Sequence, residues 1–346
     1  MEKKTVRIDY IDIMKGLGIL LVVLGHLVSE KQHQLIYAFH MPLFYLLSGM
    51  TAKRSLSIKS IKKIFDSLYR PYVVIIAVDF LLMLILIKLQ AEGSMKDLMI
   101  QSLKAVIGLG STAINGPIWF LFSIMLIKLF YSFVAQIKNN TLFHIILTTV
   151  IVISVAFVFL QNYFTYDNRI IFFQTIPGMM FFGIGFYCKD VFQLVSKQYQ
   201  KRKAFIIIAA VVLSGLFVFL TYLNGTVDMH RCMYAKPYLF ICNALLGIAA
   251  LFILSNFIDN AKFLNKIKKV LLFFGKNSII ILITHYYFTS FAYPILFKYI
   301  NLQSLLYHPA VEVLLFVLTM QIMVPIIFLF NRYFGFLFGR KKTKVK

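Results

Sequence analysis

The sequence predicts an all-α integral membrane protein, a bundle of about ten transmembrane helices, and three observations support this prediction. Hydrophobic residues make up 60% of the 346 residues and charged residues only 14%, whereas soluble domains carry about 45–50% and about 25%. The mean hydropathy is +0.82. The basic residues stand in short stretches between long apolar runs. A chain with so little polar surface is neither a soluble enzyme, nor a secreted domain, nor a disordered segment.

The apolar runs define the expected transmembrane segments, because a helix needs about 20 mostly apolar residues to cross the hydrocarbon core. Ten such segments occur, at 10–28, 34–52, 71–89, 117–137, 142–160, 170–187, 204–223, 237–257, 277–297 and 310–331. Their connections are short and the chain has no internal repeat, so we expect one membrane domain over residues 1–346. The longest connection contains an amphipathic stretch from Asp97 to Ile107, which we expect to lie at the membrane interface.

The distribution of lysine and arginine predicts the orientation of the chain. With the N-terminus inside, the cytoplasmic segments hold 26 of these residues and the outer segments hold 8. Cytoplasmic loops of membrane proteins carry such an excess. We therefore expect both termini in the cytoplasm. The expected location is a cell membrane, namely the bacterial cytoplasmic membrane. The same pattern explains the net charge of +23 without nucleic acid as a partner.

Three ionisable residues in the first apolar segment are the strongest candidates for a functional site. Asp12, Lys15 and His26 interrupt an apolar run, and charged groups inside a membrane are costly unless they are paired or hydrated. An α-helix turns by about 100° per residue, so Lys15 and His26 lie about 20° apart around the axis and about 16 Å apart along it. Asp12 and Lys15 are three residues apart and can form an ion pair. The three side chains are therefore expected to form one polar stripe across the membrane.

Two more histidines occur inside apolar segments. His40 lies in the second segment, within the run Phe39 to Phe44, and His285 lies near the middle of the ninth, downstream of Asn277 and Ser278. Imidazoles titrate near neutral pH and suit proton transfer. A buried histidine can equally be a hydrogen-bonded packing residue, and both interpretations stay open for His40 and His285.

The other polar residues of the apolar segments have simpler interpretations. Trp119, the only tryptophan, opens the fourth segment, where an anchor at the membrane interface is the favoured interpretation. Asp79 and Lys128 both lie near the centres of their segments, and a mutual ion pair would explain them. The remaining histidines lie in connections or at the ends of segments, and we expect them to be solvated: His33, His144, His230 and His308.

The segment 53–70 is strongly basic. It contains Lys53, Arg54 and Arg70 together with three further lysines. Such a segment retains a loop in the cytoplasm and attracts anionic lipid headgroups; the alternative is a site for a phosphate-rich ligand such as coenzyme A. No phosphate-binding loop of the Walker type occurs, which argues against an ATP-driven pump. The three cysteines are scattered, so we expect neither a disulfide framework nor a metal site.

Several of these residues carry a resemblance to a known family. Seven short runs are similar, in order, to the membrane-bound acyltransferase-3 family: Asp12 to Gly16, Gly25-His26, Phe39 to Phe44, Ser48-Gly49, Gly116 to Leu121, Gly183 to Phe186 and Gly275 to His285. The chain most resembles the branch related to fucose 4-O-acetyltransferases. The resemblance covers most of the chain, and the family shares the expected count of ten helices.

The resemblance implies an O-acyltransferase that takes an acyl group, acetyl in the first instance, from cytoplasmic acyl-coenzyme A. The acyl group would go to a hydroxyl of a glycan at or beyond the outer face of the membrane. The expected partners are thus acyl-coenzyme A, a glycan acceptor, the lipid bilayer and polysaccharide assembly proteins. Many family members have arginine where this chain has Lys15; lysine keeps the charge but loses a bidentate contact.

The resemblance and the polar stripe together assign roles to individual residues. His26 would act as general base on the acceptor hydroxyl or carry the acyl group briefly, and His40 would orient it or stabilise the oxyanion. Lys15 and Asp12 would anchor or polarise the donor. The remaining candidates form two groups, a substrate path with Trp119, Asn277, Ser278 and His285 and a donor site with Lys53, Arg54 and Arg70.

Two other functions fit the same residues. A proton-coupled transporter or flippase of a glycan precursor would use Asp12, His26 and Asp79 as a proton relay. Against it, the sequence shows no clear pair of broken helices in two matching halves. A structural component of a polysaccharide assembly complex would have no chemistry of its own. Binding of acyl-coenzyme A distinguishes the acyltransferase from both, and substrate counterflow identifies a transporter.

Overall fold

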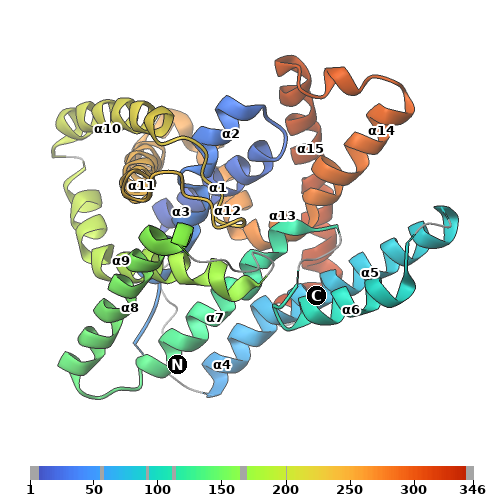
Figure 1. Cartoon of the computed structure of the whole chain (residues 1–346). Helices are drawn as coiled ribbons and strands as arrows, with labels where there is room; N and C mark the ends of the chain where they lie inside the picture. Colours follow the sequence, from blue (N-terminus) through green and yellow to red (C-terminus); the bar gives the residue numbers. More distant parts are fainter. Residues whose placement is uncertain are drawn as a thin grey trace, which may run out of the picture.

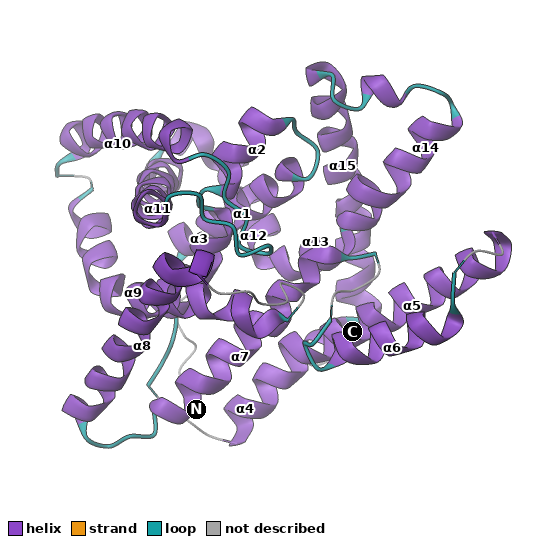
Figure 2. Ribbon diagram, in the orientation of Figure 1, coloured by secondary structure: helices purple, strands orange, loops and turns teal. Residues whose placement is uncertain are grey.

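The computed structural model describes residues 8–54, 58–90, 93–110, 114–163, 170–199 and 201–339. This part of the chain is almost entirely helical, and its only β-type pairing is one isolated bridge between Asp228 and Met233. The α-helices are α1 (Asp9–Gly25), α2 (Glu30–Tyr37), α3 (His40–Met50), α4 (Ile58–Ile64), α5 (Arg70–Gln90), α6 (Met95–Val106), α7 (Trp119–Val134), α8 (Asn140–Leu160), α9 (Ile171–Gln198), α10 (Lys203–Asn224), α11 (Pro237–Asn260), α12 (Asn265–Lys276), α13 (Ser278–Thr284), α14 (Tyr293–Tyr299) and α15 (Pro309–Tyr333). The all-α prediction is therefore confirmed (Figure 2).

Eight helical runs in the described part of the chain are long and apolar enough to cross a membrane. They cover Ser60–Leu89, Gly116–Val134, Asn140–Leu160, Ile171–Gln198, Lys203–Asn224, Pro237–Asn260, Ser278–Tyr299 and Pro309–Tyr333. Two of these runs contain a π-helical turn, η1 (Phe65–Tyr69) between α4 and α5 and η5 (Tyr287–Ala292) between α13 and α14. The eight runs coincide with the predicted segments from 71–89 onward, and the chain is a multi-pass membrane protein.

The first two predicted segments are shorter than expected. α1 has 17 residues, about 26 Å of helix, slightly less than the hydrocarbon core of about 30 Å. The segment predicted at 34–52 is divided between α2 and α3, because the ring of Pro42 would collide with the carbonyl of Ala38 in a continuous helix. α3 has only 11 residues. One unbroken helix at 34–52 is thus wrong, and the count of ten crossings stays a prediction.

α1 and α3 lie in the middle of the bundle, with α8, α9 and α10 on one side and α14, α15 and the α5–α6 pair on the other (Figure 1). Two glycines bring α1 against α12. A Cβ atom at Gly16 would collide with the backbone carbonyl of Leu271, and one at Gly275 would collide with that of Asp12. Small residues let helix backbones approach this closely in membranes.

A second pair of glycines joins α3 to α9 in the same way. A Cβ atom at Gly49 would collide with the carbonyl of Phe182, and one at Gly185 with that of Leu46. Neither helix can therefore move away from its partner without losing backbone contact. These two crossings hold α1 and α3, the short central helices, against long or amphipathic neighbours.

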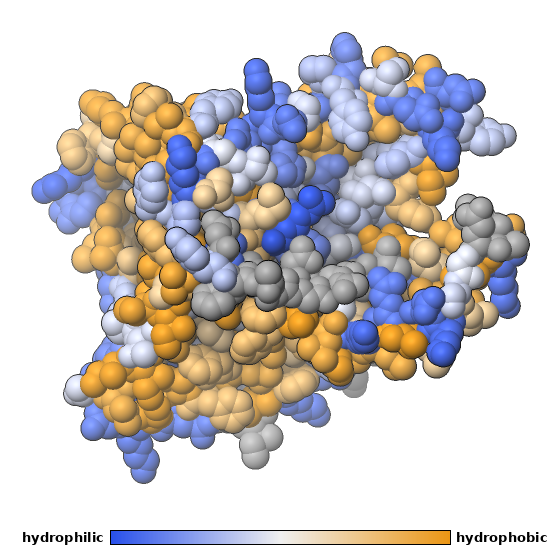
Figure 3. Space-filling view, viewed as in Figure 1, coloured by the Kyte–Doolittle hydropathy of each residue, from blue (hydrophilic) through white to orange (hydrophobic). Residues whose placement is uncertain are grey.

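The outer helices present apolar side chains away from the bundle. Leu81 on α5, Ile145 on α8, Val211 on α10 and Val313 on α15 are all exposed. Figure 3 shows apolar residues gathered over the side formed by α8, α9 and α10. Such extensive apolar surface is unfavourable in water and is the surface that faces lipid in a membrane protein.

The amphipathic stretch predicted at 97–107 forms α6. Its buried side chains, Leu98 and Ala105, lie on the side that packs against α5. The Tyr72 hydroxyl on α5 donates a hydrogen bond to the Ala105 carbonyl at 2.5 Å. α6 therefore lies along α5 as a partner helix, and its opposite side remains exposed.

Candidate active site

α1 carries three of the predicted site residues and distributes them between two cavities. Lys15 Nζ lies 3.8 Å from Asp12 Oδ1, and both residues line one cavity. His26, the C-cap of α1, lines a second cavity. The two sets of described lining residues do not overlap, and residues 16–21 of α1, about 9 Å of helix, line neither. The polar side of α1 thus serves two separate sites.

The first cavity, which we call the lysine cavity, has a volume of about 970 Å³. Its charged lining residues are Asp12, Lys15, Lys53, Lys63, Lys128, Lys189 and Asp190. They come from α1, α4, α7 and α9 and from the residues that follow α3. Five lysines against two aspartates give the walls a net positive charge, which attracts anions such as phosphate groups.

The ion pair predicted between Asp79 and Lys128 is not formed by these described residues, and that prediction was wrong. Asp79 instead accepts hydrogen bonds from the Tyr287 hydroxyl at 2.6 Å and from the Asn115 backbone N–H at 2.9 Å. The side-chain amide of Asn115 in turn donates a hydrogen bond through Nδ2 to the Ile283 carbonyl at 2.7 Å. These bonds tie α5 to the turn before α7 and to the run that contains η5, while Lys128 faces the lysine cavity.

The three basic residues proposed for donor binding have different places. Lys53 lines the lysine cavity. Arg54 donates a hydrogen bond to the Ile137 carbonyl at 2.6 Å, and Arg70 donates one to the Phe336 carbonyl at 2.7 Å. Both arginines thus connect segments that are distant in sequence, and neither is among the described residues that line the cavity.

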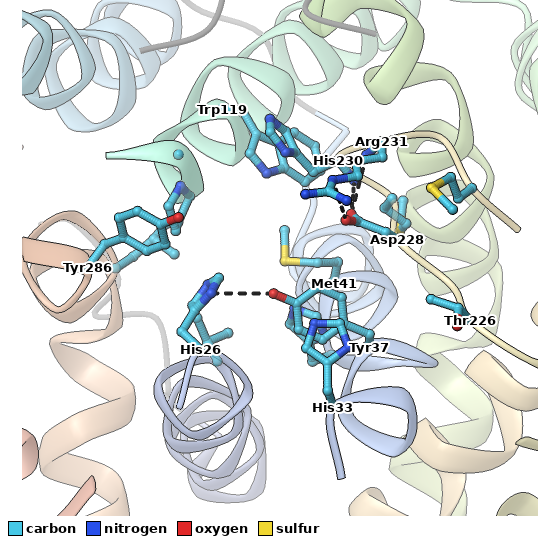
Figure 4. Close-up of a pocket in the computed structure, with 17 residues that line it drawn as sticks. His26, His33, Tyr37, Met41, Trp119, Thr226, Asp228, His230, Arg231 and Tyr286 are labelled. Atoms are coloured by element: carbon cyan, nitrogen blue, oxygen red, sulfur yellow. Dashed lines mark hydrogen bonds and ion pairs between the residues drawn. The ribbon is translucent and has the colours of Figure 1, made fainter. Parts of the chain in front are cut away.

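The second cavity, which we call the histidine cavity, has a volume of about 410 Å³. Its polar and aromatic lining residues are His26, His33, Tyr37, His40, Trp119, Thr226, Asp228, His230, Arg231 and Tyr286. Figure 4 shows His26 and Tyr286 on one side, Trp119 with His230 on a second, and His33 with Tyr37 on a third. The charged pair among them is joined, with Arg231 Nε 3.6 Å from Asp228 Oδ2. This cavity therefore has many hydrogen-bonding groups and little net charge.

His26 is surrounded by aromatic and imidazole rings. The Tyr37 hydroxyl lies 3.4 Å from His26 Nδ1. The Tyr286 ring meets the His26 ring edge-on with centroids 5.0 Å apart, and the His285 ring lies 5.4 Å from it. His285, from α13, is fully buried behind His26. The fold thus brings His26 and His285 together although 258 residues of chain separate them.

Local hydrogen bonds decide which nitrogen of His40 and His285 carries the proton. His40 Nδ1 lies 2.9 Å from the Ile36 carbonyl, and His285 Nδ1 lies 2.8 Å from the Ile281 carbonyl. A carbonyl oxygen only accepts, so Nδ1 is the donor in both rings and Nε2 of the neutral ring keeps its lone pair. Both imidazoles are therefore set up to accept a proton or a hydrogen bond through Nε2.

The remaining substrate-path candidates fall into two groups. Trp119 lines the histidine cavity and stacks on His230, with ring centroids 5.6 Å apart and planes 26° apart. Asn277 donates to the Phe273 carbonyl at 2.8 Å and accepts from Asn331 at 3.0 Å. It joins α12 to α13, which begins at Ser278, and neither residue is among the described lining of the two cavities.

The sequence model of the acyltransferase-3 family, described as an acyltransferase domain, matches residues 8–332. The chain belongs to the acyltransferase-3 family. Searches of curated proteins and of solved structures give no match. The match covers both cavities, because their described lining residues all lie within 8–332.

The histidine cavity of this acyltransferase includes two histidines that the sequence predicted to be solvated. His33 and His230 are half-buried and line the cavity. Burial lowers the pKa of both imidazoles below the usual histidine range, although Asp228 acts to raise both and Arg231 to lower both. In the sequence, only the run His230-Arg231-Cys232 draws attention to His230, and this run is too short to indicate a metal site. Among the described residues, no three His, Cys, Asp or Glu side chains are placed so that they could hold a metal ion together.

Proposed function

We propose that this acyltransferase moves an acyl group, acetyl in the first instance, from cytoplasmic acyl-coenzyme A to a hydroxyl of a cell-surface or exported glycan. The observation that carries the proposal is the pair of cavities at the two ends of the polar side of α1, one lined by lysines and one by histidines. Transfer across a membrane needs an anion-binding donor site and a separate site where a hydroxyl loses its proton. The proposed partners are therefore acyl-coenzyme A and a glycan, with assembly proteins of that glycan nearby.

The lysine cavity is the proposed donor site. Coenzyme A carries several phosphate charges, and ammonium groups bind phosphate as compact point charges. Lys53 and Lys63 belong to the basic segment that the charge distribution predicts to be cytoplasmic. The volume of about 970 Å³ lies near the upper end of the range for ligand pockets, roughly 300–1,000 Å³, which suits a large donor.

The histidine cavity is the proposed site of proton transfer. His26 takes the proton of the acceptor hydroxyl as that oxygen attacks the thioester carbonyl. The new C–O bond forms, the C–S bond breaks, and the sulfur leaves with the proton that His26 returns. In a second route a ring nitrogen of His26 attacks the thioester carbonyl, the C–S bond breaks, and the thiolate leaves with the imidazole proton. The acceptor hydroxyl then attacks the acyl group, the N–C bond breaks, and the hydroxyl proton returns to His26. This route would carry the acyl group past residues 16–21 of α1.

His40 and the tyrosines have supporting roles in this proposal. Because His40 Nδ1 donates to the Ile36 carbonyl, the neutral ring accepts through Nε2 and orients the acceptor hydroxyl rather than donating to an oxyanion. The hydroxyls of Tyr37 and Tyr286 are donors in the same cavity and suit the developing oxyanion. His285 lies behind His26 as a second proton acceptor.

The test is hydrolysis and transfer of radiolabelled acetyl-coenzyme A by the purified protein in proteoliposomes. We expect His26→Gln to lower turnover by about 10²-fold or more, the usual contribution of a general base, while acetyl-coenzyme A still binds. Lys63→Gln with Lys128→Gln should weaken that binding. His144→Gln is the matched control, since His144 lies on α8 outside both described linings.

Two results would contradict the proposal. Turnover near the wild-type level in His26→Gln would remove His26 from the chemistry. No binding of acetyl- or succinyl-coenzyme A by folded protein would remove the donor, and substrate counterflow in vesicles would then test the transporter alternative.

A further inference from the structure

The loop between α10 and α11 holds His230 at the histidine cavity through three contacts. The His230 ring stacks on Trp119. Its backbone carbonyl accepts a hydrogen bond from Gln174 Nε2 at 2.6 Å, and its backbone N–H donates to Asp228 Oδ1 at 2.8 Å. Neither ring nitrogen has a hydrogen-bond partner in the described part of the chain. The loop therefore fixes an imidazole whose own hydrogen-bonding groups remain available to a ligand.

A second imidazole is presented on another side of the same cavity. His33 stacks on Tyr37, with ring centroids 3.6 Å apart and planes 24° apart, and both residues lie on α2. The nitrogens of the His33 ring also have no hydrogen-bond partner among the described residues. Figure 4 shows the His33–Tyr37 stack away from the Trp119–His230 stack, with the cavity between them.

The charges of the cavity decide what kind of ligand fits it. Asp228 and Arg231 are its charged lining residues, and they are paired with each other. His33 and His230 are neutral near neutral pH, because burial lowers the pKa of each. The lining thus carries no net positive charge that would attract an anionic ligand, in contrast to the lysine cavity. The histidine cavity matches a ligand that is polar and uncharged.

We propose that the histidine cavity binds one uncharged sugar ring between the two imidazole–aromatic stacks, with His33 and His230 hydrogen-bonding its hydroxyl groups. A neutral imidazole offers one donor and one acceptor, and each sugar hydroxyl both donates and accepts. The aromatic faces contact the apolar C–H groups of the ring. A volume of about 410 Å³, at the small end of ligand pockets, suits a single sugar unit.

This inference rests on the proposed function only where it identifies the sugar as the acyl acceptor. His26 and His40 line the same cavity, so a sugar held there places hydroxyl groups beside the proposed base. His33 and His230 are binding residues that select the acceptor. They lie on α2 and on the α10–α11 loop, outside the central helices α1 and α3 that hold His26 and His40.

The test uses the emission of Trp119, which is the only tryptophan of the chain and lines the cavity. Purified protein in detergent is titrated with neutral methyl glycosides of glucose, galactose and mannose, and with the acidic methyl glucuronide. We expect a saturable change with at least one neutral glycoside and none with the glucuronide. His33→Ala and His230→Ala should each raise the Kd about tenfold, the equivalent of one lost hydrogen bond.

The matched control is His144→Ala, which should leave the Kd unchanged. If an alanine variant fails to fold, His33→Gln or His230→Gln keeps a donor and an acceptor at that site and should bind within a few-fold of wild type. Binding of the glucuronide alone, no saturable change with any neutral glycoside, or an unchanged Kd in both alanine variants would overturn the inference.

The two proposals fail separately. Acetyl-coenzyme A turnover that depends on His26, in a protein that ignores neutral sugars, would overturn the sugar site and keep the acyltransferase. Sugar binding that depends on His33 and His230, in a protein that never binds acyl-coenzyme A, would keep the sugar site and overturn the acyltransferase.

Discussion

Among the imidazoles of the histidine cavity, His26 and His40 differ in the hydrogen-bond partner of Nδ1. His40 is fixed in one tautomer by the Ile36 carbonyl. The nearest partner of His26 Nδ1 is the Tyr37 hydroxyl at 3.4 Å, which can donate or accept. His26 can therefore change its protonated nitrogen during a reaction, and this freedom favours it as the residue that takes and returns a proton.

His230 provides a pH-dependent prediction. Burial lowers its pKa, Asp228 acts to raise it and Arg231 to lower it. Because a protonated imidazole stacked on an indole quenches its emission, we expect the emission of Trp119 to fall as the pH is lowered, with a midpoint below about 6.5. Neutral His230, and the sugar binding that needs it, is present above that midpoint and lost below it. A fluorescence titration of wild type against His230→Gln measures this.

The His230→Gln variant should lack the transition, since glutamine does not titrate. A transition that persists in the variant would belong to another histidine of the cavity, such as His33. A midpoint at or above the ordinary histidine pKa would contradict the burial of the ring.

The sequence identifies some residues of the site and not others for a physical reason. Lys15 and His26 are conspicuous because a polar group in an apolar run is costly without a purpose. His33 and His230 stand among other polar residues, where a histidine attracts no notice. Their burial depends on how α2 and the α10–α11 loop lie against α1, and a linear pattern does not contain that information.

At the scale of helices, the stability of the crossing between α1 and α12 depends on glycine at two positions, Gly16 and Gly275, where no side chain would fit. We expect Gly16→Ala and Gly275→Ala each to destabilise the protein by about 1–3 kcal/mol, because the new Cβ would meet a backbone carbonyl that cannot move aside. Gly215→Ala in α10 is the matched control, since nothing lies within 4 Å of a Cβ there. Thermal unfolding of the three variants in detergent measures the difference.

Gly215→Ala should keep or raise the unfolding temperature, because alanine favours a helix over glycine. Equal unfolding temperatures for Gly16→Ala, Gly275→Ala and Gly215→Ala would show that α12 can shift without loss of packing, contrary to the close backbone contact.

Hydropathy locates the long helices but misses the short ones. Each of the eight long runs contains a window of 18 mostly apolar residues, so it stands out in the sequence. α12 is amphipathic and carries Lys268, which lies 2.6 Å from Asp259 and 3.0 Å from Asp9. Its polar side lowers the average hydropathy although Leu271 and Phe274 are buried. The break before α3 follows from Pro42, because proline interrupts a continuous helix even where the surrounding residues are apolar.

At the scale of the whole molecule, the charge asymmetry and the two cavities give one testable orientation. Arg231 at the histidine cavity and Lys63 at the lysine cavity are both exposed, and the positive-inside pattern places them on opposite sides of the membrane. In a chain whose three cysteines are replaced by serine, Arg231→Cys should react with an impermeant thiol reagent added to intact cells. Lys63→Cys should react only after permeabilisation, and the opposite pattern would invert the topology.

Residues 16–21 of α1 have an electrical consequence. Both cavities have exposed lining residues, and the charge asymmetry predicts that they open to opposite sides of the membrane. With that orientation, aqueous ions bring the potential of each side close to this short stretch. Its length of about 9 Å is roughly a third of the hydrocarbon core, which makes the local field about three times steeper than in the surrounding bilayer. A unit charge that crosses it senses nearly the whole membrane voltage, about 2.3 kcal/mol per 100 mV. A reaction step that moves a proton past residues 16–21 is therefore driven or opposed by the energised membrane itself.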